Sequence, residues 1–398
     1  MRVLFTTQST LSHWQPLVPL AYALESGGYE VAFAATAGFC PRIEAKGFHC
    51  FRAGRDDTPE ERQVRREQTA GLSPEEDTFF MLKNVFAGST AERSLPDLLH
   101  IIREWRPDVV VRENAEFAGC VAAESAGIPH AVVQITAPWP FFLQAVVEPV
   151  KRLRASVGLA QEETAEVLYR YLLLLPRPPS LWEPSVPMPP TVHCYRYTGF
   201  NQSGDEGLPQ WVSELDRRPM VYATLGTFEN SMTEIFEAIL DGLRDEPVNV
   251  IVTVGRNRDP IEFGEQPPNV HVERYIPQNL ILPHCDLVIC HGGSGTMMDA
   301  LSFGLPMVLI PVAADQPENA QRCMELGVAR VIGPEQRAEP NLAHTIRDAT
   351  REVLEEQHYR QNAQKLRDEM EELPGLEYVV TLLERLAAER APLTARQP

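Results

Sequence analysis

Residues 286–319 read DLVICHGGSGTMMDALSFGLPMVLIPVAADQPEN, and this stretch decides the fold. It predicts a buried strand from Asp286 to Cys290, a glycine-rich turn from His291 to Gly295, a helix from Thr296 to Phe303 and a second strand from Pro306 to Ile310. A glycine-rich turn between a strand and a helix leaves backbone N–H groups at the positive end of the helix dipole. The stretch therefore predicts a phosphate-binding turn.

The same turn lacks the signatures of several common enzyme classes. HGGSGT at 291–296 has no Lys of a Walker A loop and no G-x-G-x-x-G spacing, and Thr296 stands where a G-x-S-x-G motif needs its last glycine. The turn therefore lacks the main sequence motif of an ATPase, of a dinucleotide-dependent enzyme and of an esterase. From these residues alone, an ordinary turn without a ligand is the remaining alternative.

Length, charge and cysteine usage bound the class of protein. A chain of 398 residues is too long for one compact core and predicts two domains. A formal net charge of -19 argues against nucleic acid or an anionic membrane as the main partner. No run of apolar residues approaches the length needed to span a membrane. The seven cysteines contain no C-x-x-C pair, which predicts reduced thiols in the core and a cytoplasmic location.

The N-terminal half predicts one parallel sheet. A strand at 2–7, a helix beginning near Pro16 and a strand at 30–35 form a βαβ unit, and strands at 108–111 and 130–135 extend the series. Three other segments are predicted to lie outside this sheet. They are a charged insertion at 56–74, an aromatic segment at 138–143 and a leucine-rich segment at 169–175.

The C-terminal half starts a second alternating series. Its strands are predicted at 220–225, 248–254, 270–272, 286–290, 307–310 and 329–332. The fold class is therefore α/β, with two Rossmann-like domains facing across a cleft between the carboxyl ends of both sheets. The predicted boundaries are 1–200 for the first domain, a proline-rich linker at about 176–210, 211–373 for the second domain, and a C-terminal helix at 374–398 that returns to the first domain.

With these residues in view, the chain resembles the inverting, nucleotide-sugar-dependent glycosyltransferases of the GT-B fold. That family includes plant secondary-product, detoxifying and actinobacterial antibiotic glycosyltransferases. The resemblance covers most of the chain and is most specific at Tyr275-Ile276-Pro277-Gln278, His291–Thr296, Gly304-Leu305-Pro306 and Asp315-Gln316 with Asn319. It implies transfer of a hexose or deoxyhexose from a TDP- or UDP-sugar to a hydroxyl of a bulky, apolar natural product of the antibiotic type.

Three alternatives stay open at this point. The attacking atom could be carbon or nitrogen, because a histidine base does not determine it. The chain could be a non-catalytic auxiliary protein of the same fold, or another two-domain enzyme such as a sugar-nucleotide epimerase.

The resemblance also assigns the donor site residue by residue. It places the pyrophosphate on His291 and the turn amides, the base at Ile276 and Gln278, and the sugar hydroxyls at Asp315 and Gln316. The full set of nucleotide and phosphate contacts is Thr227, Ile276, Gln278, His291, Gly293, Ser294, Gly295, Thr296 and Asp299. Asp299 occupies the position of a ribose-binding glutamate in the family and is one methylene shorter.

The first domain carries the implied catalytic residues. His13 matches the general base of the family, and an imidazole is suited to taking a hydroxyl proton near neutral pH. Where many relatives have an aspartate that orients this histidine, the chain reads Arg112-Glu113-Asn114-Ala115-Glu116. Glu113 is the first candidate for the orienting carboxylate and Glu116 the second. The acceptor pocket is predicted to include Trp14, Trp139, Phe141 and Phe142.

The sequence predicts no bound metal and no cofactor apart from the nucleotide-sugar co-substrate. No two Asp residues stand at i, i+2, so the D-x-D metal site of the other large glycosyltransferase fold is absent. The other nine histidines show no paired zinc spacing. The expected partners are a sugar donor and a small-molecule acceptor, with a homodimer as a candidate assembly.

Overall fold

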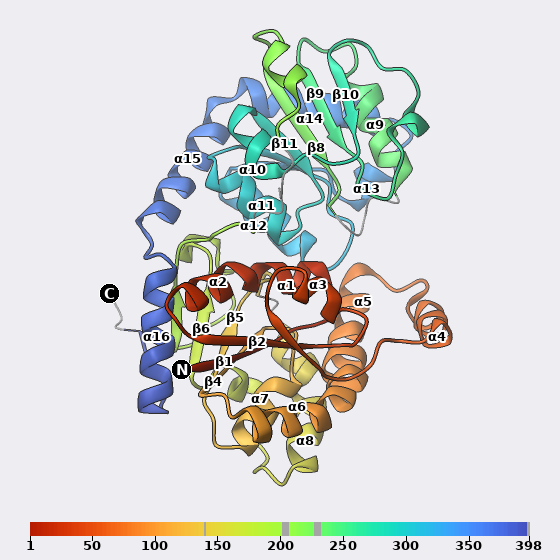
Figure 1. Ribbon diagram of the computed structural model, residues 1–398. Helices are drawn as coiled ribbons and strands as arrows, with labels where there is room; N and C mark the ends of the chain where they lie inside the picture. The colour runs from red at the N-terminus through yellow and green to blue at the C-terminus, as the bar shows by residue number, and fades with distance from the viewer. Residues whose placement is uncertain (139–140, 201–206, 227–231, 396–398) are drawn as a thin grey trace. The chain divides into compact units, whose positions relative to one another are not determined.

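The computed structural model describes residues 1–138, 141–200, 207–226 and 232–395. The chain divides into two compact units (Figure 1). Unit 1 contains residues 1–198 and 373–398, and unit 2 contains residues 199–372. Each unit holds one parallel sheet with helices, which confirms the predicted α/β class with two Rossmann-like domains.

Unit 1 is built on a seven-stranded sheet in the order β3-β2-β1-β4-β5-β6-β7. The strands are β1 (Arg2–Thr6), β2 (Glu30–Ala35), β3 (His49–Arg52), β4 (Val109–Glu113), β5 (His130–Val133), β6 (Leu172–Leu175) and β7 (Val192–Cys194). The strand order reverses direction between β1 and β4, which pair with each other in parallel. Ligands of such sheets bind beyond the carboxyl ends of the strands at this switch point.

Helices cover both faces of the unit 1 sheet, and Figure 1 shows α6, α7 and α8 together on one of them. The main helices are α1 (Leu11–Trp14), α2 (Val18–Ser26), α3 (Cys40–Glu44), α4 (Pro59–Thr69), α5 (Pro74–Phe80), α6 (Ala91–Trp105), α7 (Ala118–Ser125), α8 (Phe142–Ser156) and α16 (Leu376–Glu389). A π-helix, η2 (Met81–Thr90), joins α5 to α6, and short 3-10 turns are η1 (Gln15–Leu17), η3 (Ala165–Tyr169) and η4 (Pro179–Leu181). The C-terminal α16 packs against α2, and Tyr378 of α16 bonds His193 of β7 at 2.7 Å.

Unit 2 has a six-stranded sheet in the order β10-β9-β8-β11-β12-β13. Its strands are β8 (Met220–Thr224), β9 (Asn249–Thr253), β10 (Val270–Glu273), β11 (Leu287–Cys290), β12 (Met307–Leu309) and β13 (Ala329–Val331). Its helices are α9 (Thr233–Leu243), α10 (Gln278–Ile281), α11 (Ser294–Ser302), α12 (Gln316–Glu325), α13 (Pro334–Arg337), α14 (Leu342–Glu355) and α15 (Gln357–Glu372), with short turns η5 (Gln210–Glu214), η7 (Pro260–Phe263) and η8 (Leu282–His284). The switch point of this sheet lies between β8 and β11.

Two segments of unit 1 differ from the sequence prediction. The leucine-rich segment was expected outside the sheet, but Leu172–Leu175 forms β6 with all four side chains buried. A short, continuous apolar run carries no period that distinguishes a strand from a helix, and both faces of a parallel sheet are buried. The proline-rich stretch at 176–190 lies inside unit 1, because β7 follows it and pairs with β6.

The expected set of seven reduced cysteines is also corrected. Cys40 and Cys50 form a disulfide with a Cα–Cα distance of 5.5 Å. The short α3 lies in the connection between β2 and β3, which pair in parallel. Because the chain turns back to form β3, Cys50 in that strand comes close to Cys40 at the start of α3. The other five cysteines are not part of this disulfide, and four of them are buried.

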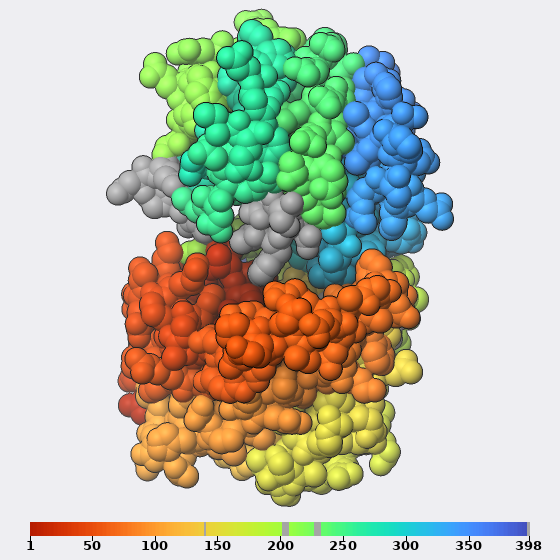
Figure 2. Space-filling model, turned by 90° about the vertical axis from the view of Figure 1, so that its right-hand side faces the viewer, coloured from red at the N-terminus to blue at the C-terminus, as the bar shows by residue number. Residues whose placement is uncertain are grey.

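The charged insertion forms helices on the surface of unit 1. It contains α4, which has no buried residue, and continues into α5. In Figure 2 these helices form the orange band across the lower part of the view. Both helices begin with a capping box, at Thr58 and Ser73, which explains why a charged segment is helical there. None of the described helices is long and apolar enough to cross a membrane.

Candidate functional site

The glycine-rich turn lies at the switch point of the unit 2 sheet. His291 follows β11 directly, and Gly293 is the N-cap of α11 with no side-chain cap hydrogen bond. The nine-residue α11 begins at Ser294, and a Cβ at Gly295 would meet open space. The start of α11 therefore presents backbone amides and a positive dipole end, as an anion site requires.

The His291 ring lies between two glycines. A Cβ on Gly293 would stand 2.4 Å from His291 Nε2, and a Cβ on Gly226 would stand 2.5 Å from His291 Cε1. Gly226 also has a φ of 72°, in the left-handed region that favours glycine. Sequence analysis alone did not indicate a role for Gly226. The pairing of Cys290 with Thr224 in neighbouring strands brings it beside the ring.

Burial sets the protonation state of His291. Desolvation lowers the pKa of this imidazole to about 4, and the opposing effect of the nearby Asp315 is smaller. The ring is therefore neutral at pH 7 and carries one N–H donor. A neutral donor binds a phosphate oxygen through a hydrogen bond without leaving a buried charge when the site is empty.

The lowered pKa of His291 predicts acid sensitivity. The pKa of His291 is about 4 in the folded state and ~6.5 in the unfolded chain. Above pH ~6.5 the histidine is neutral in both states and does not affect the free energy of unfolding. As the pH falls toward 4, the unfolded state binds a proton that the folded state does not, so the protein becomes less stable. We expect the melting temperature of the wild type to fall more between pH 7 and pH 4.5 than that of His291→Asn.

Three other histidines, His130, His193 and His271, also have lowered pKa values from burial. They are present in both proteins, so the difference between the two melting curves isolates His291. Parallel loss of stability in wild type and variant would contradict the neutral, buried state of the ring.

The Asp315-Gln316 pair lies beside the turn, with both residues buried. Asp315 Oδ2 accepts hydrogen bonds from Ser294 Oγ at 2.7 Å and Asn319 Nδ2 at 3.0 Å. Gln316 Oε1 accepts the backbone N–H of Val312 at 2.8 Å, so this oxygen supports the preceding loop. Asn319 also donates to Gly292 O at 2.9 Å and thereby links the pair to the turn. The sequence assigned Asn319 to the motif but gave it no role.

The predicted base and ribose residues surround the same helix start. Gln278 Nε2 donates to Thr296 Oγ1 at 3.3 Å, and Ile276 is buried. Asp299 is partly buried on α11, one turn beyond Gly295. Thr227 lies outside the described residues. The structure therefore brings the predicted donor residues that it describes to one end of the unit 2 sheet.

The predicted catalytic residues lie together at the switch point of the unit 1 sheet. His13 is on α1 after β1, in a helical turn where a loop was expected, and Glu113 ends β4. His13 Nδ1 is 3.0 Å from Glu113 Oε1, with side-chain exposures of 16% and 0%. A carboxylate at Nδ1 keeps the proton on that nitrogen and leaves Nε2 as the proton acceptor.

The structure distinguishes the two candidate carboxylates. Glu116 accepts hydrogen bonds from Thr6 Oγ1 at 2.5 Å and from Gly119 N at 3.0 Å, and burial raises the pKa of its carboxyl group. Glu113 is the one that meets His13. The role of either carboxylate in catalysis stays a prediction.

The predicted acceptor-pocket aromatics have different surroundings. Trp14 is 2% exposed and packs edge-on against Phe33 and Phe39, so it is a core residue. Phe142 is also a core residue, stacked on Phe117. The assignment of these two side chains to the acceptor pocket stays a prediction.

Two other aromatic side chains of unit 1, Phe141 and Phe86, have contacts that concern the predicted acceptor pocket. Phe141 is partly buried and packs near Phe79, with ring centroids 6.1 Å apart. Phe86 of η2 lies 5.7 Å from the His13 ring, a contact that the sequence did not indicate. Trp139 lies outside the described residues.

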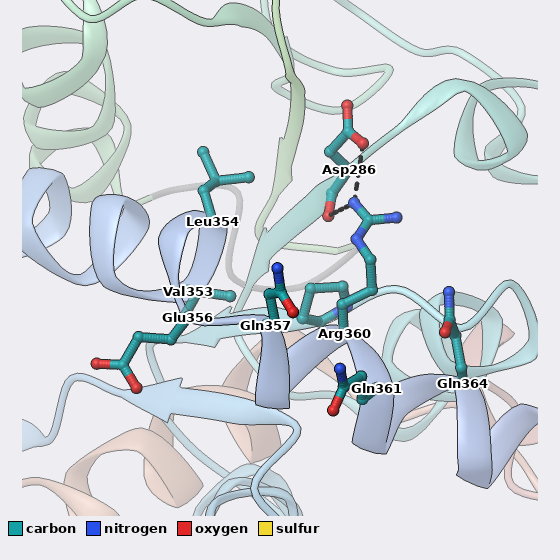
Figure 3. A pocket seen from close by; sticks show the side chains of 9 residues that line it. Asp286, Val353, Leu354, Glu356, Gln357, Arg360, Gln361 and Gln364 are labelled. Atoms are coloured by element: carbon teal, nitrogen blue, oxygen red, sulfur yellow. Dashed lines mark hydrogen bonds and ion pairs between the residues drawn. The ribbon is translucent and has the colours of Figure 1, made fainter.

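A cavity of about 320 Å³ lies elsewhere in unit 2 (Figure 3). Asp286 and Pro306 line it at the amino ends of β11 and β12, and Arg360 points toward Asp286, which it bonds at 2.8 Å. The carboxyl ends of the same strands carry His291 and the turn. This cavity is therefore at the opposite edge of the sheet from the candidate site.

Comparisons with known proteins match nearly the whole chain. Residues 22–226 match the family model of the erythromycin biosynthesis protein CIII-like N-terminal domain, and residues 237–386 match its C-terminal domain. Aclacinomycin-T 2-deoxy-L-fucose transferase of Streptomyces galilaeus is 29% identical, with 98% of this chain and 97% of the relative covered.

Two further proteins have comparable similarity. Tylactone mycaminosyltransferase of Streptomyces fradiae is 30% identical over 98% of this chain and 93% of its own length. The crystal structure of the glycosyltransferase VinC in complex with dTDP has a TM-score of 0.78 and 26% identity, covering 98% of this chain and 100% of VinC.

Proposed function

Since the chain belongs to the erythromycin biosynthesis protein CIII-like family and is a GT-B nucleotide-sugar glycosyltransferase, we propose that it glycosylates a bulky, apolar natural product. The sugar is a hexose or deoxyhexose, the donor is a TDP- or UDP-sugar, and the attacking atom is a hydroxyl oxygen. The transfer is a single displacement that inverts the anomeric centre and uses no metal ion or other cofactor. The observation that carries the proposal is the uncapped start of α11 beside the neutral His291.

The donor half of the proposal rests on the turn at α11. A departing nucleoside diphosphate carries negative charge on the oxygen released from the sugar. The amides at the start of α11 and the His291 N–H stabilise this charge as it develops, in the role that a divalent cation has in other glycosyltransferases. The buried Asp315 and Gln316 lie beside the turn, where a sugar attached to the diphosphate would be.

TDP is the nucleotide that we favour. VinC was crystallised with dTDP. The name of the Streptomyces galilaeus relative refers to transfer of 2-deoxy-L-fucose, and that of the Streptomyces fradiae relative to a mycaminosyl transfer involving tylactone. Their names also support a bulky acceptor of the antibiotic type.

The acceptor half of the proposal rests on His13. His13 Nε2 takes the proton of the acceptor hydroxyl, and its oxygen forms a bond to the anomeric carbon. The bond from that carbon to the diphosphate oxygen breaks, and the nucleoside diphosphate leaves with the electron pair. The carboxylate of Glu113 stabilises the resulting imidazolium. The ring of Phe86 beside His13 supports an apolar acceptor.

Nucleotide-dependent stability tests the donor half. A ligand at ~100 times its Kd stabilises the native state by about 2.7 kcal/mol, which raises the melting temperature. We expect TDP to raise it more than GDP, ADP or NAD, in a buffer that contains EDTA.

His291→Ala provides the matched control, because it removes the donor and leaves the helix start intact. We expect the variant to lose most of the TDP response. A response to NAD alone, or a TDP response that needs added metal, would contradict the proposed donor site.

Location and assembly remain part of the proposal. We propose a cytoplasmic location for the enzyme and a homodimer as its assembly. Cell fractionation and sedimentation velocity test these two statements.

A further inference from the structure

Unit 1 contains a fully buried arginine that the proposed chemistry does not use. Arg112 lies in β4, one residue before Glu113, and is 0% exposed. Burial of an arginine is costly unless its donors are paired. The contacts of its guanidinium therefore indicate what the charge does.

The guanidinium bonds the turn that carries Glu113. Arg112 Nη1 donates to Glu116 O at 2.9 Å and to Glu113 O at 3.1 Å, and Nη2 donates to Leu168 O of η3 at 2.7 Å. The charged group thus ties both ends of the turn at 113–116 to a neighbouring element. Because these acceptors are backbone carbonyls, the contacts set the path of the chain.

The turn geometry in turn determines where the Glu113 carboxylate lies. Glu113 Oε2 accepts the backbone N–H of Ala115 at 2.5 Å, so the side chain folds back over its own turn. Glu113 Oε1 accepts the N–H of Gln8 at 3.2 Å and faces His13 Nδ1 at 3.0 Å. A glutamate has one more rotatable bond than an aspartate, so its carboxylate needs this additional restraint to stay in place.

We propose that Arg112 is a positioning residue for the His13–Glu113 pair: by holding the turn at 113–116, it keeps the Glu113 carboxylate at His13 Nδ1. The inference rests on the proposed function of His13 as the base, and the hydrogen bonds described for the Arg112 guanidinium go to backbone carbonyls. Its effect on catalysis passes through the turn.

Arg112→Lys and Arg112→Gln test this role. Arg112→Lys keeps the charge, and Arg112→Gln keeps an NH₂ donor without the charge. Neither side chain reproduces a fork that reaches four carbonyls. A carboxylate at Nδ1 favours the charged imidazole, so its displacement lowers the pKa of His13. We expect the acidic limb of the kcat/KM profile to move to lower pH and kcat to fall about 10-fold or more.

The titration of the ring is measured separately by ¹⁵N NMR of histidine-labelled protein, with His13→Gln assigning the signal. We expect the pKa of His13 to be lower in Arg112→Lys, which keeps the positive charge, so that the shift reports the position of the Glu113 carboxylate. This readout needs no acceptor or turnover, so it distinguishes failure of the inference from failure of the proposed function. The variants keep the titratable residues near the Arg112 guanidinium, which are Glu113, Glu116, Cys120, His130 and Tyr169.

Arg154→Lys is the matched control for loss of a buried arginine. Arg154 is 3% exposed, and its described ion pairs and hydrogen bonds go to Glu124, Glu162 and Ala160 O, away from the turn at 113–116. We expect a lower melting temperature and an unchanged pKa of His13. An unchanged His13 titration in folded Arg112→Lys would overturn the proposal. Unfolding of both Arg112 variants while Arg154→Lys folds would overturn it too, because Arg112 would then be a folding residue.

Discussion

Replacing His13 by alanine is expected to lower kcat by about 10² to 10⁴-fold, the usual contribution of a general base. Glu113 holds the ring at Nδ1, so only Nε2 is available to the acceptor hydroxyl. Without the imidazole, the hydroxyl must lose its proton to water during the displacement. The affinity for TDP should change less than twofold, because the donor residues belong to unit 2.

The measurement is a comparison of kcat and of TDP affinity, with any acceptor that the wild type glycosylates. His49→Ala is the control, since His49 is an exposed histidine of the same unit and has no proposed role. A kcat for His13→Ala within threefold of the wild type would remove His13 from the mechanism. A large loss of TDP affinity would instead indicate that the variant disturbs the fold.

Replacing Gly226 by alanine is expected to weaken TDP binding by about 10-fold or more. The new Cβ would stand 2.5 Å from His291 Cε1 and 2.9 Å from Nε2, so the ring has to move. A hydrogen bond to a charged group contributes about 1.5 to 3 kcal/mol, and each 1.4 kcal/mol corresponds to about tenfold in Kd. The ring displacement should therefore be measurable by titration calorimetry with TDP.

Gly264→Ala separates this effect from backbone strain. Gly264 has a φ of 68°, close to the 72° of Gly226, but its added Cβ would meet no atom within 4 Å. Both variants should lose stability, because a side chain at a positive φ strains the backbone in each of them. Only Gly226→Ala should lose TDP affinity. Equal affinities in the two variants would show that the position of the His291 ring has no effect on TDP binding.

The turn at His291 illustrates what the sequence predicts well. A strand, a glycine-rich turn and a helix are local patterns, and residues 286–303 form these elements within one or two residues of the predicted bounds. The alternation of strands and helices also predicted a parallel sheet in each half, because crossovers between parallel strands need such helices.

The segments that the sequence misassigned lack local information. Leu172–Leu175 is apolar throughout, and only its neighbours β5 and β7 determine that it is a strand. For Trp14, which follows His13, the sequence did not indicate that the rings of Phe33 and Phe39 pack against it in the folded chain. Burial of an aromatic side chain depends on partners that are distant in sequence.

By itself, the sequence determined the α/β class and the position of the phosphate-binding turn, because strand period and turn glycines are local, and its resemblance to a known family named His13 and His291 as candidates. Only the tertiary structure showed that Gly226 lies against His291 and that Glu113, rather than Glu116, meets His13. Parallel pairing of β8 with β11 brings Gly226 to His291, and pairing of β1 with β4 brings Glu113 to His13. Such contacts depend on strand register, which forms only when the buried faces of distant segments pack together.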